Sequence, residues 1–322
     1  MTKVAVLDDW QGIARTSADW SALQAQAEVV FFQEAFANED DVAQALAVFD
    51  VVMALRERTA FPASLVKRLP KLRLFSLTGK RAGSVDMAAL AAQGVTVTTT
   101  DGSDTGAATA ELALALMLAA ARGLPAGDAA IRAGGFQTGT MPGFALEGKV
   151  LGLLGLGRLG QRMARYGSAL GMEVIAWSQN LTAEAAQEGG AAYAPLGTLL
   201  RRADVVSLHL VLSPRTRGLI GAPQLAAMKP GAILVNTSRG PLVDEAALLE
   251  ALQAGQLIAA LDVYDREPLP AGHPFRSMRN TVLTPHLGYV TQTTMREFYQ
   301  QGIENVLAFL AGAPIRVLPP GA

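Results

Sequence analysis

The sequence predicts an α/β protein with two doubly wound parallel sheets, and three observations lead to this fold class. First, short apolar runs alternate with helical patterns from residue 4 onward, as in successive βαβ units. Second, the runs have the near-continuous apolar character of parallel strands that are buried on both faces. Third, the runs form two series, and 322 residues suffice for two domains with cores of their own.

The first series of strands starts close to the N-terminus. Its strands are expected at Val4–Leu7, Val29–Phe32, Val51–Leu55, Leu72–Leu77 and Val95–Thr99. Helical patterns lie between them, for example at Asp40–Val48 and Pro62–Arg68. This alternation predicts one parallel sheet for the first hundred residues.

A long Ala/Leu-rich helix, expected at Thr105–Arg122 with Asp104 as its cap, precedes the second series. The glycine-rich segment Arg132–Gly143 then predicts a loop. The second series of strands is expected at Val150–Leu154, Val174–Trp177, Val205–Leu210, Ile233–Asn236, Ile258–Val263 and Val282–Thr284. These segments predict a second parallel sheet.

The last helical pattern, Thr293–Leu310, is long enough to dock back onto the first sheet. We therefore expect a discontinuous domain of residues 1–101 and 290–322. The domain between them would comprise residues 102–289.

The composition narrows the possible function classes. A formal net charge of −1 gives no general attraction to nucleic acid or to an anionic membrane, so neither partner is expected. The chain has no cysteine, which excludes disulfides, thiolate metal sites and cysteine nucleophiles. The histidines and acids lack the spacing of metal ligands, so no metal is expected and a metal-dependent hydrolase is disfavoured.

The N-terminal sequence predicts a location in the cytoplasm. "MTKVAVLDDW" is typical of a short buried strand that ends in acids and lacks the longer apolar core of a secretory signal. The most apolar helical stretch, Leu112–Ala121, is far too short to span a bilayer.

Three glycines stand between the first strand and the first helix of the second series, in "GLLGLGRLGQ". This context is the one in which Gly155, Gly157 and Gly160 indicate a dinucleotide-binding turn. Gly155 would allow the tight turn, Gly157 close approach of a pyrophosphate, and Gly160 close helix–strand packing. The helix N-terminus would then attract the phosphates. A tight turn without a ligand is the alternative.

The next strand ends in "WSQN", where a dinucleotide site usually has an acid for the ribose. Ser178 occupies that position, and neither a carboxylate nor a basic residue stands in the turn. The sequence therefore favours NAD only slightly and leaves NADP open.

Three strands of the second series end in groups that suit one reaction. Arg239, Glu267 and His286 each follow such a strand, and ligands of doubly wound sheets bind beyond the carboxyl ends of the strands. Histidine can exchange a proton with a hydroxyl or a carbonyl, and a nearby carboxylate favours the imidazolium. Arginine can bind a carboxylate bidentately. The three groups together predict hydride transfer to a small 2-oxo acid or from a 2-hydroxy acid.

Each of these residues also has an ordinary structural interpretation. Arg239 could be a surface charge, Glu267 a solvated loop acid and His286 a structural histidine. Among the other histidines, His209 could line the cofactor side of the site, whereas His273 is typical of a surface loop.

With these motifs and with "ADVVSLHLVLSPRTRGLIG", "MKPGAILVNTSRGPLVDEAAL", "AALDVYDREP" and "NTVLTPHLGY", the sequence resembles the D-isomer-specific 2-hydroxyacid dehydrogenase family over nearly the whole chain. The resemblance is to its phosphoglycerate dehydrogenase and glyoxylate/hydroxypyruvate reductase members. It implies a Rossmann nucleotide-binding domain and a flavodoxin-like substrate domain, with a cleft between them, and a homodimer.

The resemblance also implies roles for individual residues. Arg239 would bind the substrate, His286 would be the acid/base and Glu267 would pair with it. The implied cofactor contacts are Thr109, Gly155, Gly157, Arg158, Leu159, Gly160, Ser178, His209, Thr237, Ser238, Asp262 and Gly288. The cofactor would be NAD, with NADP left open.

The segment "LTGKRAGSVD" departs from the family pattern. The family's substrate loop commonly reads Gly-x-Gly, and its backbone amides receive the substrate carboxylate. Gly79 is kept here, but Arg81 replaces the second glycine, so Lys80 and Arg81 could add positive charge near the substrate. Arg56 also resembles a substrate-binding position, or it is a surface arginine.

One further hypothesis is a non-catalytic dimer that senses the dinucleotide and binds a protein partner. The presence of Arg239, Glu267 and His286 together favours the enzyme, since a sensor has no need of all three.

Overall fold

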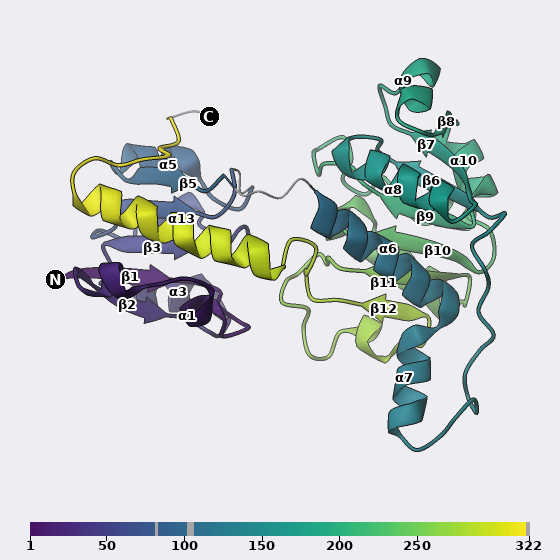
Figure 1. The fold of residues 1–322 in the computed structure, drawn as a ribbon, viewed down its shortest axis with the longest axis horizontal. Coiled ribbons are helices and arrows are strands. Elements are labelled where there is room, and N and C mark those ends of the chain that lie inside the picture. Colours follow the sequence, from purple (N-terminus) through teal and green to yellow (C-terminus); the bar gives the residue numbers. More distant parts are fainter. Residues whose placement is uncertain (81–82, 102–105, 320–322) are drawn as a thin grey trace. The chain divides into compact units, whose positions relative to one another are not determined.

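The computed structural model describes residues 1–80, 83–101 and 106–319. The chain folds into two compact units (Figure 1). Unit 1 comprises Met1–Asp104 and Thr291–Ala322, and unit 2 comprises Thr105–Val290. The sequence predicted these boundaries at 101/102 and 289/290.

Unit 1 contains a five-stranded parallel sheet in the order β2-β1-β3-β4-β5. Its strands are β1 (Thr2–Val6), β2 (Ala27–Phe31), β3 (Val51–Ala54), β4 (Leu74–Leu77) and β5 (Thr96–Thr99). Its helices are α1 (Ala14–Ser17), α2 (Ser21–Gln24), α3 (Glu39–Leu46), α4 (Ala63–Val66), α5 (Met87–Ala92) and α13 (Gln292–Leu310). This is the flavodoxin-like order, in which the strand sequence reverses between β1 and β3.

Helix α13 (yellow in Figure 1) returns the end of the chain to unit 1, where it packs against β4 and β5. The segment after it pairs with β5, because Val317 forms an antiparallel bridge with Thr98.

Unit 2 contains a seven-stranded parallel sheet in the order β12-β11-β10-β9-β6-β7-β8. Its strands are β6 (Val150–Leu154), β7 (Glu173–Trp177), β8 (Ala192–Tyr193), β9 (Val205–Leu208), β10 (Ala232–Asn236), β11 (Leu257–Leu261) and β12 (Thr281–Leu283). Its helical segments are α6 (Ala107–Arg122), α7 (Leu124–Arg132), α8 (Arg158–Ala169), α9 (Ala183–Glu188), α10 (Leu196–Arg202), α11 (Ala222–Ala226), η1 (Gly240–Leu242), α12 (Glu245–Gln253) and η2 (Pro274–Ser277). The strand order from β8 to β11 is that of the Rossmann fold.

The sheet of unit 2 is buried on both faces. Successive side chains of a strand point to opposite faces, so neighbouring residues of one strand belong to different cores. On β10, Leu234 belongs to the core on one face, whereas Ile233 and Val235 belong to the core on the other. Gly152 in β6 is required by close packing, since a Cβ there would lie 2.5 Å from Leu199 Cδ2 of α10.

These two sheets confirm the predicted fold class, α/β with two doubly wound parallel sheets. Several boundaries differ from the expectation. The strands β9 and β11 end two residues earlier than predicted, so Asp262 directly follows β11. Helix α6 begins at Ala107 after Gly106, and the expected cap Asp104 lies outside the described residues.

The sequence did not predict helix α7 or the two-residue edge strand β8. Across the described residues, no single helix has the length and apolar character to cross a membrane, although the bent pair α6–α7 passes that test when its members are taken together.

Candidate active site

The glycine turn between β6 and α8 has a structural reason for two of its three glycines. Gly155 has φ of +99°, and a Cβ there would lie 2.6 Å from the carbonyl oxygen of His209. A Cβ at Gly160 would lie 2.1 Å from the carbonyl oxygen of Gly155. By contrast, a Cβ at Gly157 would meet nothing within 4 Å, and its φ of −77° suits any residue. The fold itself therefore does not require glycine at 157, which fits a turn that leaves room for a pyrophosphate.

Helix α8 starts directly after this turn and presents its N-terminus there. Its cap residue, Gly157, offers no side chain to the first amides of the helix. The next residue, Arg158, is exposed, whereas Leu159 packs against Gly106, where a Cβ would lie 2.7 Å from Leu159 Cδ2. Uncapped amides and the helix dipole together favour an anion at this end of α8.

Strands β9 and β10 end in polar groups, some of which lack partners. The imidazole of His209, after β9, contacts Ser207 Oγ through Nε2 at 2.9 Å, while its Nδ1 is buried and has no hydrogen-bond partner among the described residues. Burial lowers the pKa of His209 to about 4, so the ring is neutral at physiological pH. The Thr237 hydroxyl, after β10, is likewise buried without a partner in the described part of the chain. Ser238 instead donates its hydroxyl to the Leu208 carbonyl at 2.7 Å.

These observations test whether the residues fit a dinucleotide. The open Gly157, the uncapped start of α8 and the unsatisfied polar atoms of His209 and Thr237 all lie at carboxyl ends of strands of one sheet. Such a set suits a ligand with phosphates and polar groups. Ser178, after β7, is half-buried.

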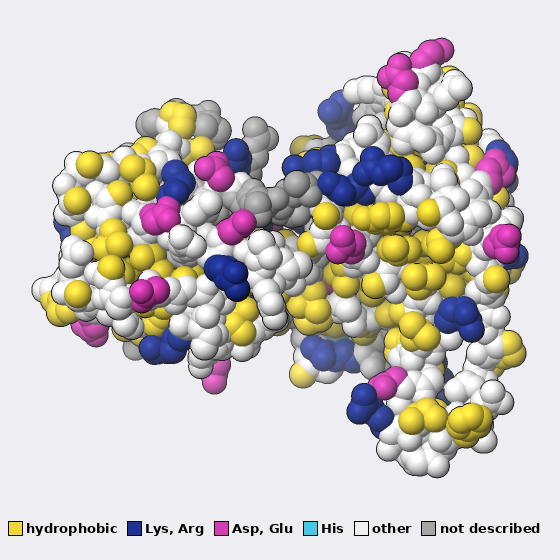
Figure 2. All heavy atoms as spheres, viewed as in Figure 1, with side chains coloured by type: hydrophobic (Ala, Val, Ile, Leu, Met, Phe, Trp, Pro, Cys, Tyr) yellow, Lys and Arg dark blue, Asp and Glu magenta, His cyan; other side chains and the backbone are white. Residues whose placement is uncertain are grey.

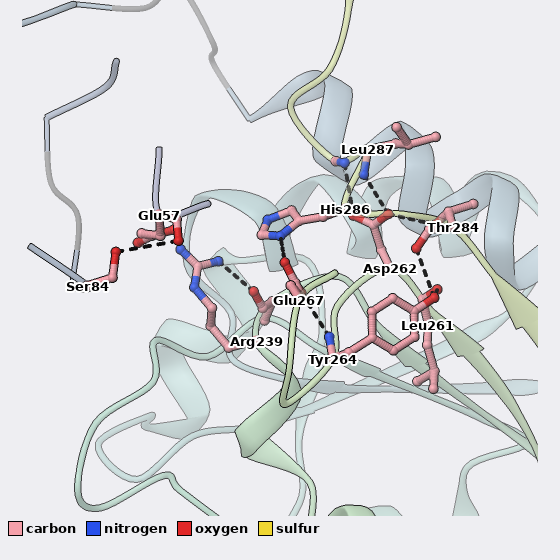
Figure 3. Close-up of polar contacts among 12 residues, drawn as sticks. Glu57, Ser84, Arg239, Leu261, Asp262, Tyr264, Glu267, Thr284, His286 and Leu287 are labelled. Carbon is pink, nitrogen blue, oxygen red and sulfur yellow. Dashed lines mark hydrogen bonds and ion pairs between the residues drawn. The ribbon is translucent and has the colours of Figure 1, made fainter. Parts of the chain in front are cut away.

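Asp262 organises the loop that follows β12. Its buried carboxylate accepts hydrogen bonds from the Thr284 hydroxyl (2.6 Å), the Leu287 amide (2.7 Å) and the Gly288 amide (2.9 Å). Its backbone carbonyl accepts from the His286 amide at 2.8 Å. Burial raises the pKa of Asp262, and the hydrogen bonds act in the opposite direction. Both oxygens therefore already have partners within this loop (Figure 3).

Gly288 and Thr109 join the same loop to helix α6. The Thr109 hydroxyl donates to the Gly288 carbonyl at 2.9 Å. A Cβ at Gly288 would lie 3.2 Å from Thr109 Cγ2 and 3.3 Å from Asp262 Oδ2. These two residues, expected at the cofactor, thus contact each other and support the loop.

His286 pairs with Glu267. The His286 Nδ1 and Glu267 Oε2 atoms lie 2.5 Å apart, and the other carboxylate oxygen accepts from the Tyr264 amide at 2.9 Å. The two side chains are 21% and 25% exposed, so neither is sealed from solvent. His286 has φ of +54°, an uncommon conformation for a residue other than glycine. With Nδ1 held by the carboxylate, Nε2 is the ring nitrogen directed away from Glu267 (Figure 3).

Arg239 follows β10 and lies beside this pair (Figure 3). Its Nη1 donates to the Ser238 carbonyl at 2.6 Å, and its own carbonyl accepts from Asn236 Nδ2 at 2.8 Å. A Cβ at Gly240 would lie 2.2 Å from the carbonyl carbon of Tyr264. The turn after β10 therefore packs directly against the segment that leads to Glu267.

The remaining expected substrate residues lie in unit 1. The Arg56 guanidinium covers Gly79, where a Cβ would lie 2.0 Å from Arg56 Nη1. The Gly79 amide donates to Thr100 Oγ1 at 2.8 Å, so this donor already has a partner. Lys80 is exposed, with Nζ 3.4 Å from Asp101 Oδ1. Arg81 lies outside the described residues.

Two residues that the sequence analysis did not single out support the pair. The Tyr264 hydroxyl donates to the Thr284 carbonyl at 2.9 Å, and the Tyr264 amide donates to Glu267 Oε1. Thr284 binds Asp262 and stands two residues before His286. The only sign of Thr284 in the sequence was a hydroxyl two residues before His286. Such a spacing is too common to identify a functional residue.

His273 lies in a loop, as expected, but its side chain is more buried than a surface-loop residue would be. Its side chain is only 12% exposed, with Nε2 3.1 Å from Glu245 Oε1 and Nδ1 accepting from the Phe275 amide. This histidine anchors the loop after β11 to helix α12, because the loop folds back on that helix.

Comparisons with known proteins show the family of this chain. Residues 114–288 match the family model described as "D-isomer specific 2-hydroxyacid dehydrogenase, NAD binding domain". Glyoxylate reductase of Aeropyrum pernix is 41% identical over 256 residues, which cover 77% of this chain and 76% of the relative. D-3-phosphoglycerate dehydrogenase of Archaeoglobus fulgidus is 36% identical over 265 residues, which cover 82% of this chain but 50% of the relative.

Among solved structures, phosphoglycerate oxidoreductase from Vibrio cholerae is 38% identical. It superposes with a TM-score of 0.90 and covers 97% of this chain and 100% of its own. The chain therefore belongs to the D-isomer specific 2-hydroxyacid dehydrogenase family, and unit 2 contains its NAD-binding domain.

Proposed function

We propose that this protein interconverts a small 2-oxo acid and the corresponding (R)-2-hydroxy acid with NAD, and that His286 is its acid/base. The observation that carries the proposal is the contact of 2.5 Å between His286 Nδ1 and Glu267 Oε2. A carboxylate on Nδ1 fixes the orientation of the ring and leaves Nε2 to exchange a proton with the substrate.

In the reductive direction, bound NADH supplies the hydride to the carbonyl carbon. The chain's own residues do the remaining work. His286 donates the Nε2 proton to the carbonyl oxygen and becomes neutral, while Glu267 keeps the ring in place. Arg239 binds the substrate carboxylate and polarises the neighbouring carbonyl. In the oxidative direction, neutral His286 takes the hydroxyl proton.

The cofactor would be held by the turn from Gly155 to Gly160 and by the first amides of α8 at the pyrophosphate. Thr237 and His209 would line the nicotinamide side, where their unsatisfied polar atoms support the assignment. Asp262 would act mainly through the loop, because both of its oxygens already accept hydrogen bonds within it.

A preference for NAD over NADP is part of the proposal. Ser178 would meet the adenine ribose without a charge of either sign, so we expect NADH to be favoured and NADPH to be accepted more weakly. The ratio of kcat/KM for the two cofactors measures this preference directly.

The substrate is proposed from the relatives. Because a relative at 41% identity is named glyoxylate reductase, glyoxylate is the first substrate to test, followed by hydroxypyruvate and longer 2-oxo acids. We expect turnover of at least one acid with NADH. Tight NADH binding without turnover of any acid would instead support a non-catalytic sensor.

Arg239 tests the carboxylate half of the mechanism. We expect Arg239→Ala to raise KM for the acid and to lower kcat, because the guanidinium contacts both the carboxylate and the reacting carbonyl. Arg239→Lys should recover only part of the loss, since lysine cannot form the bidentate contact. Unchanged KM in Arg239→Ala would refute this role.

We also propose that the protein is a homodimer that buries helix α7 and the segment after it. Four hydrophobic side chains between residues 124 and 141 are strongly exposed: Leu124 (55%), Ile131 (57%), Phe136 (73%) and Met141 (83%). Figure 2 shows hydrophobic side chains at the surface over α6 and α7. Exposed apolar patches of this kind are typical of subunit interfaces.

A further inference from the structure

The exits of β1 and β3 in unit 1 form a polar cluster that the proposed mechanism does not use. These neighbouring strands flank the point at which the strand order of the sheet reverses, and ligand sites of such sheets form at the carboxyl ends of the strands there. Asp8 follows β1 with φ of +62°, and Arg56 follows β3 with φ of +57°. Two left-handed residues other than glycine, on adjacent strand exits, need contacts that hold them in place.

Asp8 supplies such contacts to the turn of residues 56–59. Its Oδ1 accepts from the Thr59 hydroxyl at 2.7 Å, and its backbone carbonyl accepts from Arg58 Nη1 at 2.8 Å. The Arg58 guanidinium also lies over the Trp10 ring, 4.8 Å from its centroid. The residue Asp8 is only 1% exposed, and burial raises its pKa to about 6. A buried acid of this kind destabilises the fold at neutral pH and calls for a functional reason.

The other end of the turn is fixed by β4. The Arg56 amide donates to Thr78 Oγ1 at 2.9 Å, and the Arg56 guanidinium covers Gly79. The turn is thus fastened to β4 through residue 56 and to β1 through residues 58 and 59. These contacts hold the backbone of Arg56, from which its guanidinium extends over Gly79.

We propose that Asp8 and Thr59 are positioning residues for substrate binding: they hold the turn that carries Arg56, and so set where its guanidinium meets the anionic group of the acid. The proposal rests on the proposed function and adds to it that Arg56 binds the substrate, the role that the family resemblance implies for this residue. Asp8 and Thr59 need not touch the substrate themselves.

Matched variants separate this role from a general effect on folding. Thr59→Val is nearly isosteric and removes the hydroxyl that Asp8 accepts, whereas Thr59→Ser keeps it. Asp8→Ala removes the acceptor, and Asp8→Asn retains an oxygen in its place. Asp9→Ala is the control, because Asp9 is equally buried but its carboxylate accepts from the amides of Ile13 and Ala14 instead.

Two measurements are made on the full chain: KM and kcat for glyoxylate at saturating NADH, and hydrogen–deuterium exchange of residues 56–59. In Thr59→Val and Asp8→Ala we expect KM to rise by about tenfold, which corresponds to one lost hydrogen bond, with kcat within about twofold of the wild type. Exchange of the segment should accelerate in the same two variants. Thr59→Ser and Asp8→Asn should restore both values.

The proposal is overturned if KM and exchange are unchanged in Thr59→Val and Asp8→Ala, or if Asp9→Ala changes them equally. The two measurements also separate this inference from the proposed function. If the wild type reduces no 2-oxo acid, the proposed function fails. The exchange of residues 56–59 then still decides the inference, because faster exchange in Thr59→Val but not in Asp9→Ala supports it and equal exchange refutes it.

Discussion

His286 is held by its backbone as much as by its side chain. The left-handed φ of +54° is unfavourable for histidine, yet the Asp262 carbonyl fixes its amide and the Asp262 carboxylate fixes the next two amides. Glu267 then fixes the ring through Nδ1. A side chain restrained at both ends loses little freedom when it meets the substrate, which is what preorganised catalysis requires.

Replacing His286 tests its role in proton transfer. We expect His286→Gln to lower kcat by roughly 10²–10⁴-fold, because glutamine cannot transfer the proton. The Kd for NADH, measured by quenching of protein fluorescence, should stay within about twofold, since no implied cofactor contact is removed. Wild-type turnover in this variant would remove His286 from the mechanism.

Asp8 gives a pH-dependent prediction. Its folded-state pKa is raised from 3.8 to about 6, so the folded chain keeps a proton that the unfolded chain has released. The stability gained from that proton is complete below pH 4 and is lost as the pH rises through 6. The loss is about 3 kcal/mol, at about 1.4 kcal/mol for each unit of the pKa difference.

Asp8→Asn removes this titration. The variant should therefore unfold at higher urea concentration than the wild type at pH 8, and the difference should shrink towards pH 4. Trp10 and Trp20, both in unit 1, report the transition by fluorescence. A difference that is the same at pH 4 and pH 8 would contradict a raised pKa.

The sequence predicted some of these residues and missed others, for a physical reason. Arg239, Glu267 and His286 could be grouped in advance because parallel strands of one sheet end at the same edge. The network around Asp8 could not, since Thr59 is distant in sequence and its hydroxyl could have bonded elsewhere. The partner of the Gly79 amide, Thr100, was hidden for the same reason.

Among the structural elements, the turn between β6 and α8 contains glycines with two different purposes. Glycine is needed at residue 160 because helix α8 passes close to the Gly155 carbonyl. At Gly157, by contrast, no atom lies within 4 Å of the position that a Cβ would take. The same short motif therefore contains one glycine that serves the fold and one that leaves space for a ligand.

This difference predicts opposite results for two alanine variants. Gly157→Ala should leave the melting temperature nearly unchanged and weaken NADH binding by roughly tenfold, because the new methyl group would fill space that the proposed pyrophosphate needs. Gly160→Ala should destabilise the protein by about 1–3 kcal/mol, because the helix must move away from the Gly155 carbonyl. Calorimetry measures the change in stability, and NADH titration measures the change in affinity. Equal NADH affinity in Gly157→Ala and the wild type would argue against a dinucleotide at this turn.

The elements that the sequence did predict are those with the strongest patterns. Buried strands such as β6 and β10 have apolar runs bounded by turn residues, and their positions were found to within a residue. Helix α7 follows α6 after a single glycine, Gly123, and contains Pro125 and Gly127, so its sequence resembled a loop and not a helix. Strand β8 has two exposed residues and exists only because β7 offers an edge to pair with.

For the complete protein, the exposed hydrophobic side chains on the surface of unit 2 have no function in a single chain. Helix α7 buries none of its own residues, and the hydrophobic side chains from Leu124 to Met141 face solvent. Leaving them in water is unfavourable by about 25 cal/mol for each Å² of apolar surface. A second copy of the chain that covers them would remove this penalty.

The last prediction follows from that surface. We expect the wild type to sediment as a dimer, and Ile131→Asp with Phe136→Ser to shift it to the monomer, since an interface cannot accept a buried, unpaired carboxylate. Val48→Asp is the matched control: Val48 is a 46% exposed hydrophobic residue of unit 1, and its replacement should not change the mass. Analytical ultracentrifugation at several concentrations distinguishes the two forms. If the double variant remains a dimer, the interface lies elsewhere, and the exposed residues of α7 must contact a different partner.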